Sequence, residues 1–185
     1  MSEIRPKRYK LKNEAKIAIR SARPSDARLM LEHRRTIIGE DLSNITMLDE
    51  FKETVEQTAH SIGQYTQNPG RLVLVAELDN RLLGTLWFTN SSRRRLSHRG
   101  VFHIGVRADY RRLGVGTGML NTLIEWAREN PVIEKVCASV LATNRAAILL
   151  CDRCGFLQEG RRVQEVRIAE GQYVDEILMY RLVRE

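Results

Sequence analysis

The feature of this sequence that most constrains its fold is a glycine-spaced turn, Arg111-Arg112-Leu113-Gly114-Val115-Gly116-Thr117-Gly118. An apolar run at residues 101–106 precedes the turn. The residues after it repeat apolar side chains at the three- and four-residue spacing of one helical face, namely Leu120, Leu123, Ile124 and Ala127. Asn130-Pro131 ends that pattern. The order strand, glycine turn, helix predicts a site for a bound anion at the turn.

Glycine suits such a turn for two physical reasons. A backbone that directs several N–H groups at one bound group leaves no room for large Cβ atoms, and glycine adopts a positive φ at little cost. A phosphate or pyrophosphate is the predicted ligand, with Arg111 and Arg112 adding charge-assisted hydrogen bonds at its rim. The turn lacks both the Gly-Lys-Ser/Thr of a P-loop and the G-x-G-x-x-G spacing of a dinucleotide site. On the pattern alone, a tight turn without a ligand remains the alternative.

The length, the hydropathy and the cysteines predict a single cytoplasmic domain. A chain of 185 residues fits one domain. No apolar run approaches the roughly 20 residues of a membrane helix, and residues 1–16 lack the apolar core of a secretory signal. Three cysteines, Cys137, Cys151 and Cys154, are too few for a disulfide framework. The C-x-x-C formed by the last two has no second ligand pair, so we expect no metal site.

The charge balance favours an anionic ligand or partner. The formal net charge is +7 and the sequence pI is about 9.7, which suits either a nucleic acid or a polyphosphate cofactor. The basic residues are dispersed except at residues 5–16 and 93–95, and few aromatic residues lie among them. A base-stacking surface is therefore poorly supported. We expect solvated loops there rather than a nucleic-acid site, and no membrane partner.

The chain reads as a basic N-terminal arm, residues 1–15, followed by one domain, residues 16–185. The arm is either mobile or an added edge strand. Periodicity and turn residues predict helices at 24–38, 48–65, from the glycine turn to 130, and 145–153. Strands are predicted at 16–21, 72–78, 82–89, 101–106, 135–141, 156–166 and 173–182. This order predicts a mixed α/β (α+β) fold with a sheet of about seven strands and four flanking helices.

Three segments resemble one known family. The pattern Arg/Gln-x-x-Gly-x-Gly/Ala, here Arg111, Gly114 and Gly116, resembles the pyrophosphate signature of the GNAT superfamily of acyl-CoA-dependent N-acetyltransferases. Residues 144–156, from Asn144 through Cys154-Gly155-Phe156, are similar to its Asn-x-x-Ala-x-x-x-Tyr-x-x-x-Gly-Phe. The ending at residues 171–180 is similar to bacterial members. The order of elements from 16 to 182 resembles the family's as well.

The resemblance implies a central twisted mixed sheet in which strands 101–106 and 135–141 splay apart. Acetyl-CoA would be the co-substrate, with its pantetheine arm in the gap, paired as an extra strand with the backbone of Ile104, Gly105 and Val106. Asn144 would bond the same arm. The pyrophosphate would lie on the glycine turn, whose implied contacts are Arg111, Arg112, Leu113, Gly114, Val115, Gly116 and Thr117.

Acetyl transfer to an amine needs a neutral amine, a stabilised oxyanion and a proton for the departing thiolate. The sequence departs from the family here, because its Tyr position is Cys151 and its carboxylate positions are Val101 and Ser139. A thiol can protonate a thiolate of similar basicity, so Cys151 is a candidate donor. His103 is a candidate base, and Tyr173 is a reserve donor. For each of the three, a purely structural role remains the alternative.

The family's acceptor site usually involves the segment between the first two helices. In this chain that segment is acidic and would attract a cationic amine, although a solvated acidic face is the alternative; its carboxylates are Glu40, Asp41, Asp49, Glu50 and Glu53. The leading hypothesis is an N-acetyltransferase that moves acetyl directly from acetyl-CoA to a primary amine of a small molecule or a protein N-terminus. A non-catalytic acyl-CoA-binding protein and a ribosome- or nucleic-acid-associated factor are the alternatives. A homodimer is left open.

Overall fold

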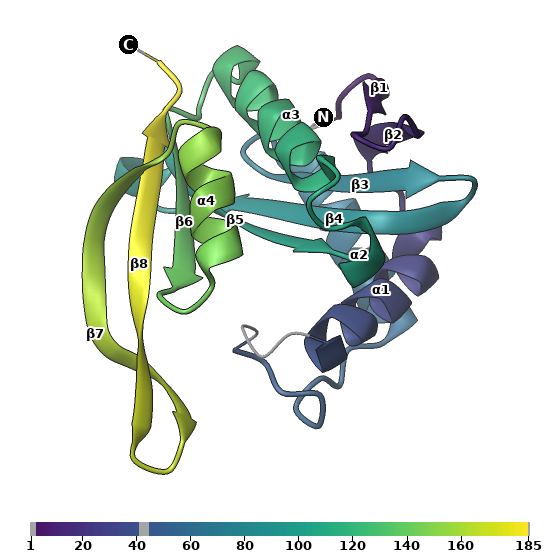
Figure 1. The fold of residues 1–185 in the computed structure, drawn as a ribbon. Helices are drawn as coiled ribbons and strands as arrows, with labels where there is room; N and C mark the ends of the chain where they lie inside the picture. Colours follow the sequence, from purple (N-terminus) through teal and green to yellow (C-terminus); the bar gives the residue numbers. More distant parts are fainter. Residues whose placement is uncertain (1–2, 41–44, 185) are drawn as a thin grey trace.

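The computed structural model describes residues 3–40 and 45–184 and is built around one mixed sheet (Figure 1). The sheet has eight strands in the order β1-β2-β3-β4-β5-β6-β8-β7. The strands are β1 (Lys7–Lys10), β2 (Lys16–Ser21), β3 (Leu72–Leu78), β4 (Arg81–Asn90), β5 (Arg99–Val106), β6 (Lys135–Leu141), β7 (Leu157–Ala169) and β8 (Gln172–Leu182). The helices are α1 (Ala27–Glu40), α2 (Val55–Gln67), α3 (Val115–Glu129) and α4 (Arg145–Arg153).

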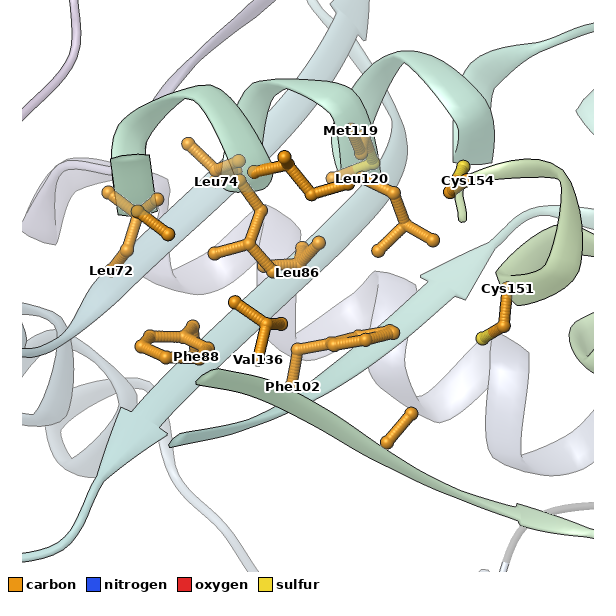
Figure 2. Close-up of a cluster of buried hydrophobic side chains, with 14 of the residues drawn as sticks. Leu72, Leu74, Leu86, Phe88, Phe102, Met119, Leu120, Val136, Cys151 and Cys154 are labelled. Atoms are coloured by element: carbon orange, nitrogen blue, oxygen red, sulfur yellow. The ribbon is translucent and has the colours of Figure 1, made fainter. Parts of the chain in front are cut away.

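Helices cover both faces of the sheet, with α1 and α2 on one side and α3 and α4 on the other (Figure 1). Successive residues of a strand point to opposite faces, and β3 follows this rule. Leu72, Leu74 and Ala76 belong to the large core under α3 and α4 (Figure 2). Val73 and Val75 pack with α1 and α2. A central strand buried on both faces explains why residues 72–76 form a continuous apolar run.

The mixed α/β class and the four helices are confirmed, but the strand number of about seven is one too low. The additional strand is β1, which pairs antiparallel with β2 from Lys7↔Ile19 to Lys10↔Lys16. Residues 7–10 of the basic arm are therefore an edge strand. In this edge strand only the side chain of Tyr9 is partly buried. The other three residues are charged, so the strand lacks the apolar–polar alternation that marks the other strands.

The second helix begins at Val55, seven residues later than the apolar spacing predicts. Thr54 is its N-cap, and the Thr54 side chain accepts a hydrogen bond from the N–H of Gln57 while the Gln57 side chain accepts from the N–H of Thr54. This capping box fixes the start of the helix. The residues upstream of Thr54 have helical apolar spacing but form a loop, in which Phe51 is buried beneath the guanidinium of Arg34.

Strands β5 and β6 are parallel neighbours for only three residue pairs, from Arg99↔Lys135 to Val101↔Cys137. Beyond Val101 they diverge, and β6 continues in antiparallel pairing with β8 as far as Leu141↔Glu176. Residues 102–106 of β5 therefore have no strand partner on their β6 side. The sheet is open at its middle, with α3 and α4 on one face of the opening and α1 beside the other (Figure 1).

The N-terminal segment braces the glycine turn. Lys12 donates its N–H to the carbonyl of Leu113 at 3.0 Å, and a Cβ added at Gly118 would lie 3.1 Å from the ring of Tyr9. Lys7 of β1 also forms an ion pair with Glu125 of α3. The N-terminal segment is thus fixed to α3 and to the turn that precedes it.

Candidate functional site

The glycine turn forms the N-terminus of α3. Gly114 is the N-cap residue, with φ +108°, and it offers no side chain to cap the helix. The first intrahelical bond runs from the N–H of Gly118 to the carbonyl of Gly114 at 2.9 Å. The N–H groups of Val115, Gly116 and Thr117 precede that bond, so they are the free donors of the first turn. Three free donors at the positive end of a fifteen-residue helix could hold an anion.

The three glycines of the turn have different roles. Only Gly114 has a positive φ and open space, since a Cβ there would meet no atom closer than 3.9 Å. A Cβ at Gly116 would lie 3.0 Å from Leu150 of α4. A Cβ at Gly118 would lie 2.9 Å from Ile19 of β2. Gly116 and Gly118 therefore allow close packing of α3 on its neighbours, and of the three only Gly114 is needed for the backbone conformation of the turn.

The free edge of β5 presents backbone groups to the gap. Arg107 donates its N–H to Leu83 of β4 at 2.9 Å. Backbone groups alternate in direction along an antiparallel pair, so Gly105 also faces β4, while Ile104 and Val106 direct their N–H and C=O groups into the gap. The Nε of Arg111 donates to the Val106 carbonyl at 2.9 Å. Arg111 thus holds the end of β5 against the glycine turn.

Asn144 lies where β6 leads into α4. Its Oδ1 accepts a hydrogen bond from the N–H of Ala147 at 3.0 Å, which makes it the N-cap of α4. The cap uses the carbonyl oxygen of the amide, and the amide NH₂ is the group that can donate to a ligand in the gap.

The side chains of β5 divide between its two faces. A Cβ at Gly105 would lie 3.5 Å from Ile37 of α1, so Gly105 and, two residues earlier, His103 face α1. Phe102 and Ile104 face the other way, where Phe102 stacks edge-on against Phe156 with ring centroids 5.6 Å apart. Any group held in the gap would have His103 on one face and α4 on the other.

His103 is exposed on the α1 face, opposite Trp87 of β4. Its pKa is lowered below the ordinary value of 6.5 by partial desolvation and by the positive charge of Arg34. Arg34 itself pairs with Glu53 at 2.7 Å. The imidazole is therefore neutral at neutral pH and can accept a proton.

Cys151 lies on the opposite side, in the core under α4 and close to Phe102 (Figure 2). Only 2% of it is exposed, and burial raises its pKa to about 12, with smaller contributions from Cys154 and Asp152. The thiol is fully protonated at physiological pH. Tyr173 is 48% exposed on the part of the β7–β8 hairpin that projects beyond β6, opposite Arg167 (Figure 1). The structure places Cys151 beside the opening and Tyr173 on this projection.

Comparison with known proteins agrees with this geometry. The model of the acetyltransferase (GNAT) family matches residues 39–156, more than half of the chain. The chain belongs to the GNAT acetyltransferase family. Its membership confirms the expected reaction class, acetyl transfer with acetyl-CoA as the co-substrate.

Relatives of this family resemble the chain in sequence and in structure. An L-amino acid N-acetyltransferase, AaaT, of Escherichia coli (strain K12) is 29% identical over 114 residues, which cover 62% of this chain and 70% of that protein. A GNAT acetyltransferase from Streptococcus pneumoniae superposes with a TM-score of 0.87 at 25% identity, over 91% of this chain and 99% of that one. The yncA protein of Salmonella typhimurium, solved with its cofactor acetyl-CoA, has a TM-score of 0.81 at 19% identity, over 91% and 95% of the two chains.

A buried histidine that the sequence did not mark as special lies next to this GNAT site. His33 of α1 is 4% exposed, and its Cε1 would lie 3.6 Å from a Cβ at Gly105. Its Nδ1 is 3.5 Å from the hydroxyl of Thr85. Burial and the charge of Arg107 lower its pKa to about 4, although an interaction with the Leu83 carbonyl partly opposes them. His33 is neutral and packs α1 against β4 and β5.

The acidic segment between α1 and α2 is partly neutralised by its own contacts. Glu53 pairs with Arg34 and also accepts a hydrogen bond from Thr58 at 3.2 Å. Glu50 accepts from the N–H of Met47 at 2.9 Å. Asp41 lies outside the described residues. The segment also exposes three apolar side chains, those of Ile45, Met47 and Leu48, so its surface is less anionic than the sequence suggests.

In residues 3–40 and 45–184, no cluster of His, Cys, Asp and Glu side chains could hold a metal ion. None of the helices in these two ranges is long and apolar enough to cross a membrane.

Asn144→Ala is expected to reduce stability and acetyl-CoA affinity together. Loss of the cap on Ala147 costs about 1 kcal/mol, and loss of the amide NH₂ removes a donor from the edge of the gap. Thr54→Ala is the matched control, because it removes the N-cap of α2, which lies away from the gap. Thermal melting and calorimetry of both variants test this. Equal melting losses with unchanged affinity in both would leave Asn144 with the capping role alone.

Proposed function

We propose that the protein is an N-acetyltransferase that moves the acetyl group of acetyl-CoA directly to a primary amine of a small molecule or of a protein N-terminus. The observation that carries the proposal is the opening between β5 and β6, bordered by the free edge of β5 and ending at three N–H donors of α3. Pantetheine carries amide groups that match the exposed edge at Ile104 and Val106. Its pyrophosphate matches the N–H groups of Val115, Gly116 and Thr117.

The remaining predicted contacts have supporting roles in this proposal. Gly114 gives the turn its left-handed geometry, and Arg112, with φ +62°, changes the chain direction just before it. Arg111 braces β5 through Val106. Leu113 packs against the core and accepts the N–H of Lys12. Each of them fixes the position of the donors rather than recognising the acetyl group.

The acceptor amine would approach from the α1 face, where His103 is the available base. A neutral imidazole accepts the proton of an ammonium group directly or through one water, and leaves a nucleophilic amine beside the gap. The N–H groups at the edge of β5 are donors for the oxyanion of the tetrahedral intermediate. The E. coli relative is named for L-amino acids, which supports a small primary amine as the acceptor class.

Cys151 is a poor proton donor despite its place in the family motif. Its pKa of about 12 lies well above that of an ordinary thiol, about 8.5, so proton transfer from Cys151 to a free thiolate is strongly uphill. We propose that solvent supplies this proton and that Cys151 fills space beside Phe102.

Cys151→Ala should therefore change kcat by less than about tenfold, which is below the roughly 10²- to 10⁴-fold that a general acid contributes. Cys137→Ala is the matched control, because Cys137 is also a buried thiol, 6% exposed, and lies on β6. Steady-state kinetics at saturating acetyl-CoA provide the measurement. A hundredfold loss of kcat in Cys151→Ala alone, with acetyl-CoA affinity intact, would restore the donor role.

A turnover screen with acetyl-CoA tests the function itself. Thiol release and product mass would be followed with amino acids, polyamines, aminoglycosides and peptides with free N-termini. An acetylated amine confirms the proposal. Tight acetyl-CoA binding without turnover on any class of amine would favour the non-catalytic alternative. That alternative is motivated by Val101 and Ser139, which occupy positions where family members carry a carboxylate. RNA binding that falls steeply with salt, without acetyl-CoA binding, would favour the nucleic-acid alternative.

A further inference from the structure

A second pocket lies at the other end of α3 from the glycine turn. Its volume is about 360 Å³, which is within the range of small-molecule sites. The end of α3, the turn after α4 and the last residues of β8 form its walls. Three arginines line it, Arg128, Arg181 and Arg184, and no carboxylate side chain is among its described lining residues.

Two of these guanidinium groups are held in place by backbone carbonyls. Arg181 donates from Nη1 to the carbonyl of Cys154 at the end of α4. Arg184 donates from Nη2 to the carbonyl of Asn130 at the end of α3. A Cβ at Gly155 would lie 3.1 Å from Nη1 of Arg181, so this glycine lets the guanidinium lie against the chain. An arginine side chain has five N–H donors, so Arg181 and Arg184 each keep further donors for a ligand.

The charges at this pocket do not cancel. The C-termini of α3 and α4 each contribute about half a negative charge, against three positive guanidinium groups. Glu159, on the adjoining part of β7, is already paired with Lys135. Among the described residues that line the pocket, the charge of the three guanidinium groups therefore exceeds these partial negative charges.

One side of the pocket is apolar. Leu157 and Leu182 line it, and they are 62% and 60% exposed. Tyr180 pairs with Leu157 and also lines the pocket; the side chains of Leu157, Tyr180 and Leu182 lie on one face of the sheet, and Arg181 extends from the other. Apolar side chains this exposed beside a fixed group of cations suit a ligand with a charged head and a hydrocarbon body.

We propose that this pocket binds a small organic anion, whose phosphate or carboxylate group contacts the three arginines and whose apolar body lies on Leu157 and Leu182. The site is separate from the acetyl-CoA site, because the fifteen residues of α3 span roughly 20 Å. It does not depend on the proposed acetyltransferase activity.

Calorimetry on the full chain, saturated with acetyl-CoA, tests the proposal. The probe is octyl phosphate below its micellar concentration, and octanoate in a parallel titration distinguishes a phosphate head from a carboxylate head. We expect one site per chain, weaker binding of inorganic phosphate and none of octanol. No binding of either amphiphilic anion, or displacement of the probe by further acetyl-CoA, would overturn the proposal.

Arg128→Gln is the decisive variant, because no described contact ties Arg128 to a helix end. It should weaken octyl phosphate binding at least about tenfold, the effect of losing one charge-assisted hydrogen bond. Arg153→Gln is the matched control, since Arg153 is exposed in the last turn of α4 and does not line the pocket. Leu182→Asp, at an exposed position, should abolish binding and keeps the test valid if Arg128→Gln melts early. Equal losses in the two arginine variants, or unchanged binding in Leu182→Asp, would overturn the proposal.

Discussion

Gly114→Ala is expected to weaken acetyl-CoA binding about a hundredfold. At φ +108° a Cβ is strained whatever space surrounds it, and the chain relieves the strain, about 1–2 kcal/mol, by rotating the turn. That rotation redirects the N–H groups of Val115, Gly116 and Thr117. Hydrogen bonds to a charged group contribute about 1.5–3 kcal/mol each. The loss of two of them accounts for at least a hundredfold in affinity.

Gly171→Ala is the control that separates strain from site geometry. Gly171 also has a positive φ, +68°, and no atom lies within 4 Å of its added Cβ. It is in the turn between β7 and β8, away from the gap. Both variants should lose similar stability in thermal melting, and calorimetry should show an affinity loss only in Gly114→Ala. An equal affinity for acetyl-CoA in the two variants would remove the glycine turn from the cofactor site.

His103→Ala is expected to lower kcat/KM by about 10²- to 10⁴-fold, the usual contribution of a general base. Desolvation and the charge of Arg34 lower the pKa of His103, which favours its neutral, basic form at neutral pH. In the wild type, kcat/KM should therefore rise with pH through an apparent pKa below 6.5 and then level off. Arg34→Gln removes the nearby positive charge, and it should shift that limb to higher pH.

His60→Ala is the matched control for this histidine. His60 is on α2 and bonds to Gln64 at 2.9 Å, away from β5. It should keep both the rate and the pH profile. A pH limb that persists in His103→Ala with a near wild-type rate would assign proton removal to water or to another group.

The parts of the fold that local chemistry determines were predictable from the sequence. Strand β6 begins and ends at the predicted residues, because β-branched residues alternate between two clear breaks. Helix α4 begins after Asn144 and ends before Gly155, whose φ is +74°, since both ends carry their own capping residues. The start of α2 was predicted incorrectly, because the residues just upstream of Thr54 have helical apolar spacing but form a loop that buries Phe51.

The site was predictable only where it consists of backbone. The glycine turn follows from its residue spacing, and the free edge of β5 was expected from the resemblance to the GNAT family. The different roles of Gly114, Gly116 and Gly118 depend on which neighbour each one faces, and those neighbours come from distant parts of the chain. The chemical states of His103 and Cys151 likewise depend on burial and on Arg34, which sequence spacing does not give.

The bracing of the glycine turn by the N-terminal strand has a practical consequence for handling this protein. The family match begins at residue 39, yet Lys12 and Tyr9 contact the turn and the first half of α3. A protein shortened to the matched region would lose the support on one side of its glycine turn. Removal of part of the first dozen residues together with a purification tag carries the same risk. The affinity for acetyl-CoA should therefore be compared between proteins tagged at the N-terminus and at the C-terminus before a low activity is interpreted.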